Sequence, residues 1–118
     1  FQQTSSRFAF SSGWTTATSD KYSGGSVKYT KTDGKSMRVT FTGRAFAFVT
    51  SVRAGQPLTV DTYLDGVPTG QNSVSSAVET KLRVQLWTAT YPTSFRRTIR
   101  YVVDGTNRFD VDAIAVLE

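Results

Sequence analysis

Residues 36–52, SMRVTFTGRAFAFVTSV, decide the fold class of this chain. Up to Gly43 the stretch alternates strictly between apolar and polar residues, a period of two that is typical of a β-strand with one buried face. The apolar members of the alternation are Met37, Val39 and Phe41. After Gly43 the run 45–49, AFAFV, is apolar on both faces, as in a strand that lies deep in a fold. The stretch therefore predicts a long strand at the centre of a β-sheet.

Shorter alternating runs fill the rest of the chain, with turn signals at intervals of about 8–12 residues. We expect strands over the ranges 7–10, 26–30, 57–64, 81–87, 95–103 and 109–117. The dipeptide Asp65-Gly66 predicts a tight hairpin, because both residues tolerate the positive φ of a primed turn. Ranges 67–78 and 88–94 are interpreted as loops. No stretch has helical periodicity, so the pattern predicts an all-β sandwich or barrel of about eight strands.

Length and composition indicate one folded domain. The chain has 118 residues, of which 38% are hydrophobic and 13% aromatic. A chain of this size buries roughly two-thirds of its unfolded surface. We expect residues 1–6 to be the end of a linker and residues 7–118 to form a single β-sandwich domain. The aromatic residues expected in its core are Phe8, Phe10, Phe41, Phe46, Phe48, Tyr101 and Phe109.

The chain contains neither cysteine nor histidine, which excludes several kinds of site. Without cysteine there are no disulfides, thiolate zinc sites or thiol nucleophiles. Without histidine the commonest general base is missing, and so is the Ser-His-Asp arrangement. Aspartates for glycosidase chemistry are present, but none lies in a recognisable acid–base context, and no GxSxG elbow occurs. We therefore expect no catalytic residues.

The net charge of +5 favours anionic partners such as acidic polysaccharide, cell-wall polymer or nucleic acid. The basic residues are scattered singly along alternating strands, which is more typical of a solvated surface than of a binding patch. No single-strand-binding or groove-reading signature occurs, so nucleic acid is not an expected partner. No apolar run approaches the roughly 20 residues that cross a bilayer, so membrane insertion is not expected.

Several short motifs follow one another in a moderately specific order. They are Ser12-Gly13-Trp14, Tyr22-Ser23-Gly24-Gly25-Ser26, Val39-Thr40-Phe41-Thr42-Gly43, Val60-Asp61-Thr62-Tyr63-Leu64-Asp65-Gly66 and Asp110-Val111-Asp112-Ala113-Ile114-Ala115-Val116-Leu117. From Arg7 onward the set resembles the jelly-roll, galactose-binding-like modules of bacterial exported proteins, which are often appended to hydrolases. Such modules often carry Gly-x-His before the penultimate strand. Here that region reads Ser94-Phe95-Arg96-Arg97, so a function resting on that histidine does not carry over.

The resemblance implies an antiparallel two-sheet jelly-roll β-sandwich with a non-catalytic, glycan-binding or scaffolding role. We therefore expect an extracellular or cell-surface accessory module, monomeric and without a cofactor. Its partners would be polysaccharide or cell-wall glycan and the other domains of its parent protein. The alternative is a structural, adhesion or protein-interaction module without a small ligand. A third hypothesis is a fragment of an enzyme whose catalytic residues lie elsewhere in the parent.

Trp87 is the leading candidate for a sugar platform. Carbohydrate recognition needs flat apolar surfaces for sugar C–H faces and planar hydrogen-bonding groups for hydroxyl pairs. If the alternation that begins at Leu82 holds, Trp87 points away from the core beside Arg83, with Tyr91 in the following loop. We then expect Trp87, Tyr91 and Arg83 to be ligand-binding residues. The alternative is that Trp87 packs beneath that loop as a core residue.

Four further residues are weaker candidates. Tyr22 adjoins a Gly/Ser-rich loop and could line a pocket, and Arg53 could hold a ligand hydroxyl or carboxylate, although a solvated loop arginine is the commoner case. Asp110 and Asp112 share a strand face and could be ligands of a structural calcium ion. The alternative for them is that a carboxylate bridges strands near the end of the chain.

Overall fold

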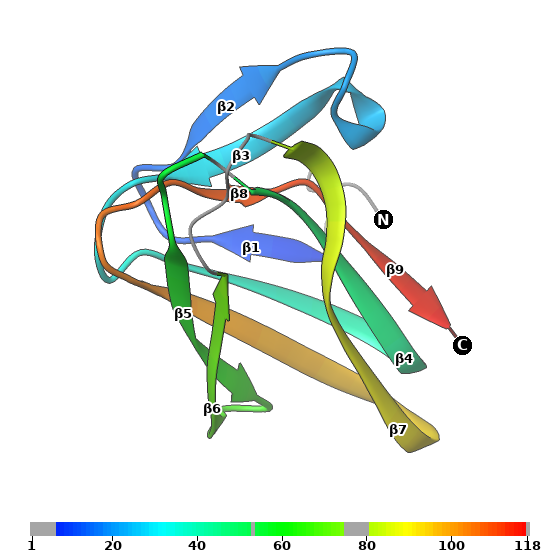
Figure 1. Ribbon diagram of the computed structural model, residues 1–118. Helices are drawn as coiled ribbons and strands as arrows, with labels where there is room; N and C mark the ends of the chain where they lie inside the picture. Colours follow the sequence, from blue (N-terminus) through cyan, green and yellow to red (C-terminus); the bar gives the residue numbers. More distant parts are fainter. Residues whose placement is uncertain (1–6, 53, 75–80, 118) are drawn as a thin grey trace.

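A computed structural model describes residues 7–52, 54–74 and 81–117, which form nine strands and one short 3-10 turn (Figure 1). The strands are β1 (Phe8–Phe10), β2 (Thr15–Thr18), β3 (Ser26–Thr30), β4 (Ser36–Val52), β5 (Leu58–Leu64), β6 (Val67–Val74), β7 (Lys81–Asp104), β8 (Phe109–Val111) and β9 (Ala113–Leu117), and the turn η1 is Ser23–Gly25. No helix in this part of the chain is long and apolar enough to cross a membrane.

The strands form two antiparallel sheets. The larger has the order β1-β4-β7-β5-β6, with β9 also paired to β4, and the smaller has the order β2-β3-β8. This arrangement confirms the predicted all-β, two-sheet antiparallel β-sandwich. The range 109–117, expected as one strand, is divided at Asp112 into β8 in the smaller sheet and β9 in the larger. The chain therefore changes sheets at Asp112.

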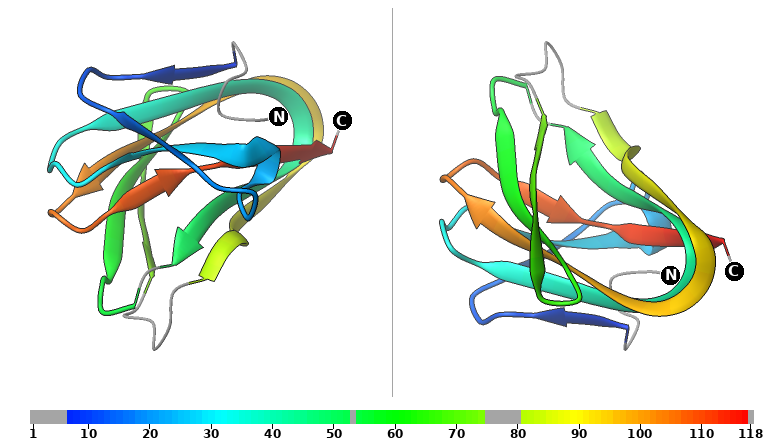
Figure 2. Two further views of the ribbon diagram at one scale, coloured as in Figure 1. Left: turned by 90° about the horizontal axis from the view of Figure 1, so that it is seen from above. Right: turned by 90° about the horizontal axis from the view of Figure 1, so that it is seen from below.

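The two longest strands, β4 and β7, are paired along most of their length within the larger sheet, which curls over so that it contributes to both layers of the sandwich (Figure 2). The first half of β4 has β1 as its second neighbour, through Phe8 opposite Val39. The second half has β9 instead, through Ala47 opposite Ala115. Both strands curl together between these two halves (Figure 2). The stretch 36–52 is thus the centre of the fold, as its sequence predicts.

Segment 88–94 does not form the predicted loop but belongs to β7. Thr90 pairs with Ala45 and Phe95 pairs with Gly43, so the residues between Thr90 and Phe95 bulge out of the ladder. A bulge bends the strand that carries it, which explains why β7 curls here instead of ending. The residues in this segment favour a turn, and the sequence carries no sign of the main-chain pairing on either side of it.

Gly43 makes the curl of β4 possible. A Cβ atom built on Gly43 would lie 2.6 Å from Cγ1 of Val116 and 2.8 Å from the carbonyl oxygen of Leu117. Such contacts are far inside van der Waals distance, so only glycine allows the end of β9 to approach the backbone of β4 this closely.

The hairpin predicted at Asp65-Gly66 is present and joins β5 to β6. Asp65 has φ 50° and Gly66 has φ 84°, the positive values that a primed turn requires. Range 67–78 is not a loop in its described part, because β6 covers Val67–Val74 and pairs with β5. β6 lies at the edge of the larger sheet, and its sequence is polar on both faces. An alternation of apolar and polar residues therefore cannot identify β6 from the sequence.

Aromatic side chains fill the space between the layers. Phe48, Tyr101 and Phe109 are buried, and their rings contact one another at centroid distances of 5.1 to 6.2 Å. Phe8, Phe41 and Phe46 are also buried, whereas Phe10 is partly buried against this core. The predicted aromatic core is therefore confirmed, with Phe10 at its margin.

Candidate functional site

Trp87 does not point away from the core, so the prediction of an exposed platform there is wrong. The side chain is 7% exposed, and its ring stacks on that of Phe48 at 5.6 Å. Phe48 pairs with Trp87 whereas Val49 pairs with Gln85, so β7 has one residue more than β4 at this point. One extra residue reverses the alternation that begins at Leu82. A buried indole cannot present its face to a sugar, and the alternative of a core tryptophan is correct.

Tyr22 is buried as well and does not form the wall of an open pocket. Its hydroxyl accepts a hydrogen bond from Nη2 of Arg108 at 3.3 Å. Nε of Arg108 in turn contacts Oδ1 of Asp110 at 2.6 Å, and the guanidinium lies 3.8 Å from the ring centroid of Tyr29. Tyr22 therefore belongs to a structural network that ties the segment around η1 to β3 and β8.

The two aspartates proposed as calcium ligands lie in the interior. Asp110 is 1% exposed and its carboxylate is held by Arg108, which fits the alternative of a strand-bridging role. Asp112 is also buried, and its backbone N–H donates to the carbonyl oxygen of Val49 at 3.1 Å. The two do not lie on one continuous strand, because the chain changes sheets at Asp112. Among the described residues no group of three or more acidic side chains could hold a metal ion.

Two predicted ligand residues remain predictions. Arg83 lies in β7, but its side chain is outside the described part of the structure. Arg53 is outside the described residues altogether.

Among the predicted ligand residues whose side chains are described, Tyr91 is partly exposed, and it also packs against the core. It lies in the bulge of β7, half-buried, and the guanidinium of Arg97 covers its ring at 3.9 Å from the centroid. Nη2 of Arg97 donates to the carbonyl oxygen of Thr93 at 2.9 Å, which fixes the guanidinium over the ring. Phe95 is 61% exposed, and its ring centroid lies 5.7 Å from the same guanidinium. We call Tyr91, Phe95 and Arg97 the bulge platform.

The hairpin at the end of β5 is fastened beside the bulge platform by Asp65. The backbone N–H of Asp65 donates to the carbonyl oxygen of Thr98 at 2.9 Å, and Oδ1 of Asp65 accepts from the N–H of Thr98 at 2.8 Å. Burial raises the pKa of the Tyr91 phenol, the positive charge of Arg97 partly offsets this, and the Asp65 carboxylate adds to the rise. The phenol is therefore protonated at neutral pH and can donate a hydrogen bond.

The bulge platform combines the two kinds of surface that a sugar needs. Phe95 offers an exposed apolar face, while the Arg97 guanidinium and the Tyr91 hydroxyl offer planar or directional donors. Sequence reasoning missed Phe95 and Arg97 as site residues. One signal was available: Arg97 has the same phase in β7 as the inward residues Ile99 and Tyr101, and an arginine at an inward position is unusual.

No protein-family model matches the chain, and no curated protein matches it in sequence. Among solved structures it superposes with a TM-score of 0.68 and 17% identity on the catalytic domain of a GH87 alpha-1,3-glucanase variant in complex with tetrasaccharides, over 100% of its own length. It also matches a family two carbohydrate esterase from Cellvibrio japonicus, with a TM-score of 0.65, 10% identity and 97% of its length covered. A third match is a Paenibacillus cycloisomaltooligosaccharide glucanotransferase complexed with cycloisomaltoheptaose, with a TM-score of 0.63, 14% identity and 92% of its length covered.

These matches establish the fold as one that occurs within larger proteins. The chain spans 27% of the matched glucanase chain, 31% of the esterase chain and 17% of the glucanotransferase chain. At such identities the likeness is one of fold, since site residues are not shared by fold alone.

Proposed function

We propose that this chain is a non-catalytic carbohydrate-binding module of a larger exported protein, which binds polysaccharide or cell-wall glycan through the bulge platform. The observation that carries the proposal is the exposed Phe95 ring beside the Tyr91–Arg97 stack. The occurrence of the same fold within a glucanase, a carbohydrate esterase and a glucanotransferase supports it.

In this proposal the C–H face of one sugar ring packs on Phe95. The Arg97 guanidinium donates to a pair of vicinal hydroxyls, and the Tyr91 hydroxyl donates to a third. Thr93 already holds Arg97 in place, so little side-chain entropy is lost on binding. Phe95 is 61% exposed, and an exposed ring suits anchoring to a polymer better than enclosing a single sugar.

The arrangement of two surface carboxylates, those of Asp61 and Asp104, supports a binding role over catalysis at this place. Asp61 and Asp104 are brought together, because Nε2 of Gln71 donates to Oδ1 of Asp61 at 2.8 Å and to Oδ2 of Asp104 at 3.3 Å. Glycoside hydrolysis needs two carboxyl groups on opposite sides of an enclosed scissile bond. Here one amide bridges both carboxylates on an open sheet face.

The test is retention of the domain on insoluble α-glucan, β-glucan and bacterial cell walls, at low and at high salt. We expect one of these glycans to retain the wild type at both salt concentrations. Phe95→Ala should weaken that retention about five- to tenfold, because it removes the apolar platform. Tyr91→Phe should weaken it less, since it removes only the hydroxyl.

Val67→Ala is the matched control. Val67 is as exposed as Phe95, at 61%, but lies on the edge strand β6. Equal losses for Phe95→Ala and Val67→Ala would contradict the assignment of the platform. Failure of all three glycans to retain the wild type would favour the structural or protein-interaction module instead.

A further inference from the structure

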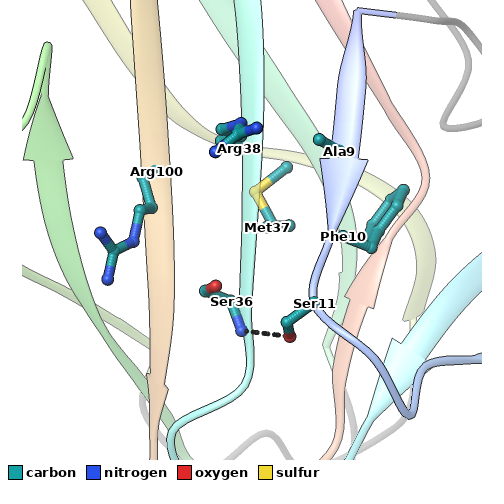
Figure 3. Close-up of a pocket in the computed structure, with 7 residues that line it drawn as sticks. All are labelled: Ala9, Phe10, Ser11, Ser36, Met37, Arg38 and Arg100. Carbon is teal, nitrogen blue, oxygen red and sulfur yellow. Dashed lines mark hydrogen bonds between the residues drawn. The ribbon is translucent and has the colours of Figure 1, made fainter.

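The outer face of the larger sheet, opposite to the core, carries an unusual row of residues. Across neighbouring strands, Ala9 of β1 pairs with Arg38 of β4, Arg38 with Arg100 of β7, and Arg100 with Tyr63 of β5. Both arginines are exposed and lie directly opposite each other in the ladder, and the side chain of Arg100 extends away from Arg38 (Figure 3). Residues opposite each other in antiparallel strands have Cβ atoms about 4.5–5.5 Å apart, and like charges in such pairs destabilise a sheet.

Neither arginine forms an ion pair with an acidic side chain in the described part of the chain. The guanidinium of Arg100 lies 4.8 Å from the ring centroid of Tyr63, and the side chain of Arg38 has no hydrogen bond or ion pair with a described residue. Asp61, on the neighbouring row, accepts a hydrogen bond from Gln71 instead. Two cationic groups thus remain with donors available for an anion.

A shallow trough of about 310 Å³ lies between these arginines and β1 (Figure 3). Its lining consists of Ala9, Phe10, Ser11, Ser36, Met37, Arg38 and Arg100. Oγ of Ser11 accepts hydrogen bonds from the backbone N–H of Ser36 at 3.0 Å and from Nε1 of Trp14 at 3.2 Å. Both lone pairs of that oxygen are therefore occupied. The hydroxyl proton of Ser11 remains available for donation, because no hydrogen bond among the described residues uses it. The trough thus holds guanidinium and hydroxyl donors together.

We propose that this trough binds the anionic group, carboxylate or sulfate, of an acidic polysaccharide. The Arg38 guanidinium takes the anion in a bidentate pair, Arg100 adds a second positive charge, and the hydroxyls of Ser11 and Ser36 meet the oxygens of the sugar. The like charges of the two arginines destabilise the ligand-free protein. A bound anion offsets this repulsion, and the relief contributes to the affinity. This site is separate from the bulge platform, because Arg100 faces outward whereas Arg97 has the phase of the core residues.

The residues of the trough favour a polysaccharide over a nucleic acid. Single-stranded nucleic acids bind through exposed aromatic rings on which bases stack. The guanidinium of Arg100 covers the ring of Tyr63, and the Phe10 ring packs edge-on against that of Trp14 at 5.1 Å. Among the described residues, Phe10 is the one aromatic residue that lines the trough.

The experiment is affinity electrophoresis of the native domain in gels that contain dextran, carboxymethyl-dextran or dextran sulfate, which share one backbone and differ in charge. We expect retardation in one or both anionic gels and none in neutral dextran beyond that in an empty gel. Arg38→Gln and Arg100→Gln should each raise the dissociation constant about tenfold, because each removes charged hydrogen bonds. The two anionic gels distinguish a carboxylate ligand from a sulfate.

Arg44→Gln is the control, since it removes the same charge from an exposed residue of β4 outside the trough. An equal loss in this variant would overturn the proposal and assign the retardation to net charge. Unchanged binding in both trough variants would overturn it too, and so would tighter, Arg38-dependent binding of oligo-dT. The melting temperatures of the trough variants should stay at or above that of the wild type. Phe95→Ala should leave the retardation unchanged, which separates this test from that of the bulge platform.

Discussion

At the scale of single residues, two aromatic side chains of β7 have similar chemistry but differ in burial. Trp87 packs at the centre of the core, whereas Phe95 is 61% exposed at the bend of the strand. Hydrophobicity does not distinguish them, since either side chain would gain free energy from burial. The positions of the bulges decide which ring points inward and whether the opposite layer is there to cover it.

The role of Trp87 can be tested by truncation. Trp87→Ala removes a ring that contacts Phe48, Tyr101 and Phe109, so we expect a loss of about 3–5 kcal/mol in the free energy of unfolding. Denaturant titration measures this loss. Tyr91→Ala, at a half-buried position, should cost less. A loss below about 1 kcal/mol for Trp87→Ala would contradict its place in the core.

At the scale of elements, the curved pair of β4 and β7 decides how the two layers are joined. One strand that serves two layers needs a bend, and a bend needs local departures from regular pairing. Here the departures are Gly43 in β4 and, opposite the residue that follows it, a long bulge at residues 91–94 of β7. The bulge also carries Tyr91 of the platform, and Phe95 is the first residue that pairs again after it, so the bend of β7 brings the candidate site together.

Gly43→Ala tests this account of the bend. The new Cβ would clash with a side chain and a backbone carbonyl of β9, and the carbonyl cannot rotate away. We expect a loss of about 1–3 kcal/mol in the free energy of unfolding and faster amide exchange in β9 than in β5. Gly34→Ala tests backbone strain without a clash, because Gly34 has φ +83° and a Cβ there has nothing within 4 Å, whereas Gly43 has no positive φ. Unchanged exchange in β9 would show that the close approach is not required.

At the scale of the whole molecule, the sandwich encloses an ionisable phenol. Burial raises the pKa of Tyr101, and the nearby Tyr91 phenol adds to the rise. The folded state therefore favours the neutral phenol more strongly than the unfolded state does. This contribution to stability is fully present below the unfolded pKa of 10.0 and is lost as the pH rises above it.

Alkaline unfolding measures that contribution. Above about pH 10 Tyr101 should decrease the free energy of unfolding by about 1.4 kcal/mol per pH unit, until its folded-state pKa is reached. Tyr101→Phe should remove this part of the slope. Equal slopes for wild type and Tyr101→Phe between pH 10 and 11.5 would contradict the assignment.

The sequence by itself determined the fold class, the central stretch 36–52, the Asp65-Gly66 hairpin and most of the aromatic core. These features depend on residues that are close together in the chain. Alternation indicates a strand with one buried face, and glycine in a turn indicates a positive φ. Of the site, it identified Tyr91 as a surface aromatic residue but gave Trp87 the wrong face and assigned no role to Phe95.

Only the tertiary structure decided where the strands bulge, which layer each half of β4 joins, and which arginines lie opposite each other. Bulges and pairings depend on the partner strand, whose register is set by contacts between residues far apart in the chain. One inserted residue at Leu86 is enough to turn Trp87 inward, and nothing in the composition of β7 marks it. The opposition of Arg38 and Arg100 likewise exists only because β4 and β7 pair in this register.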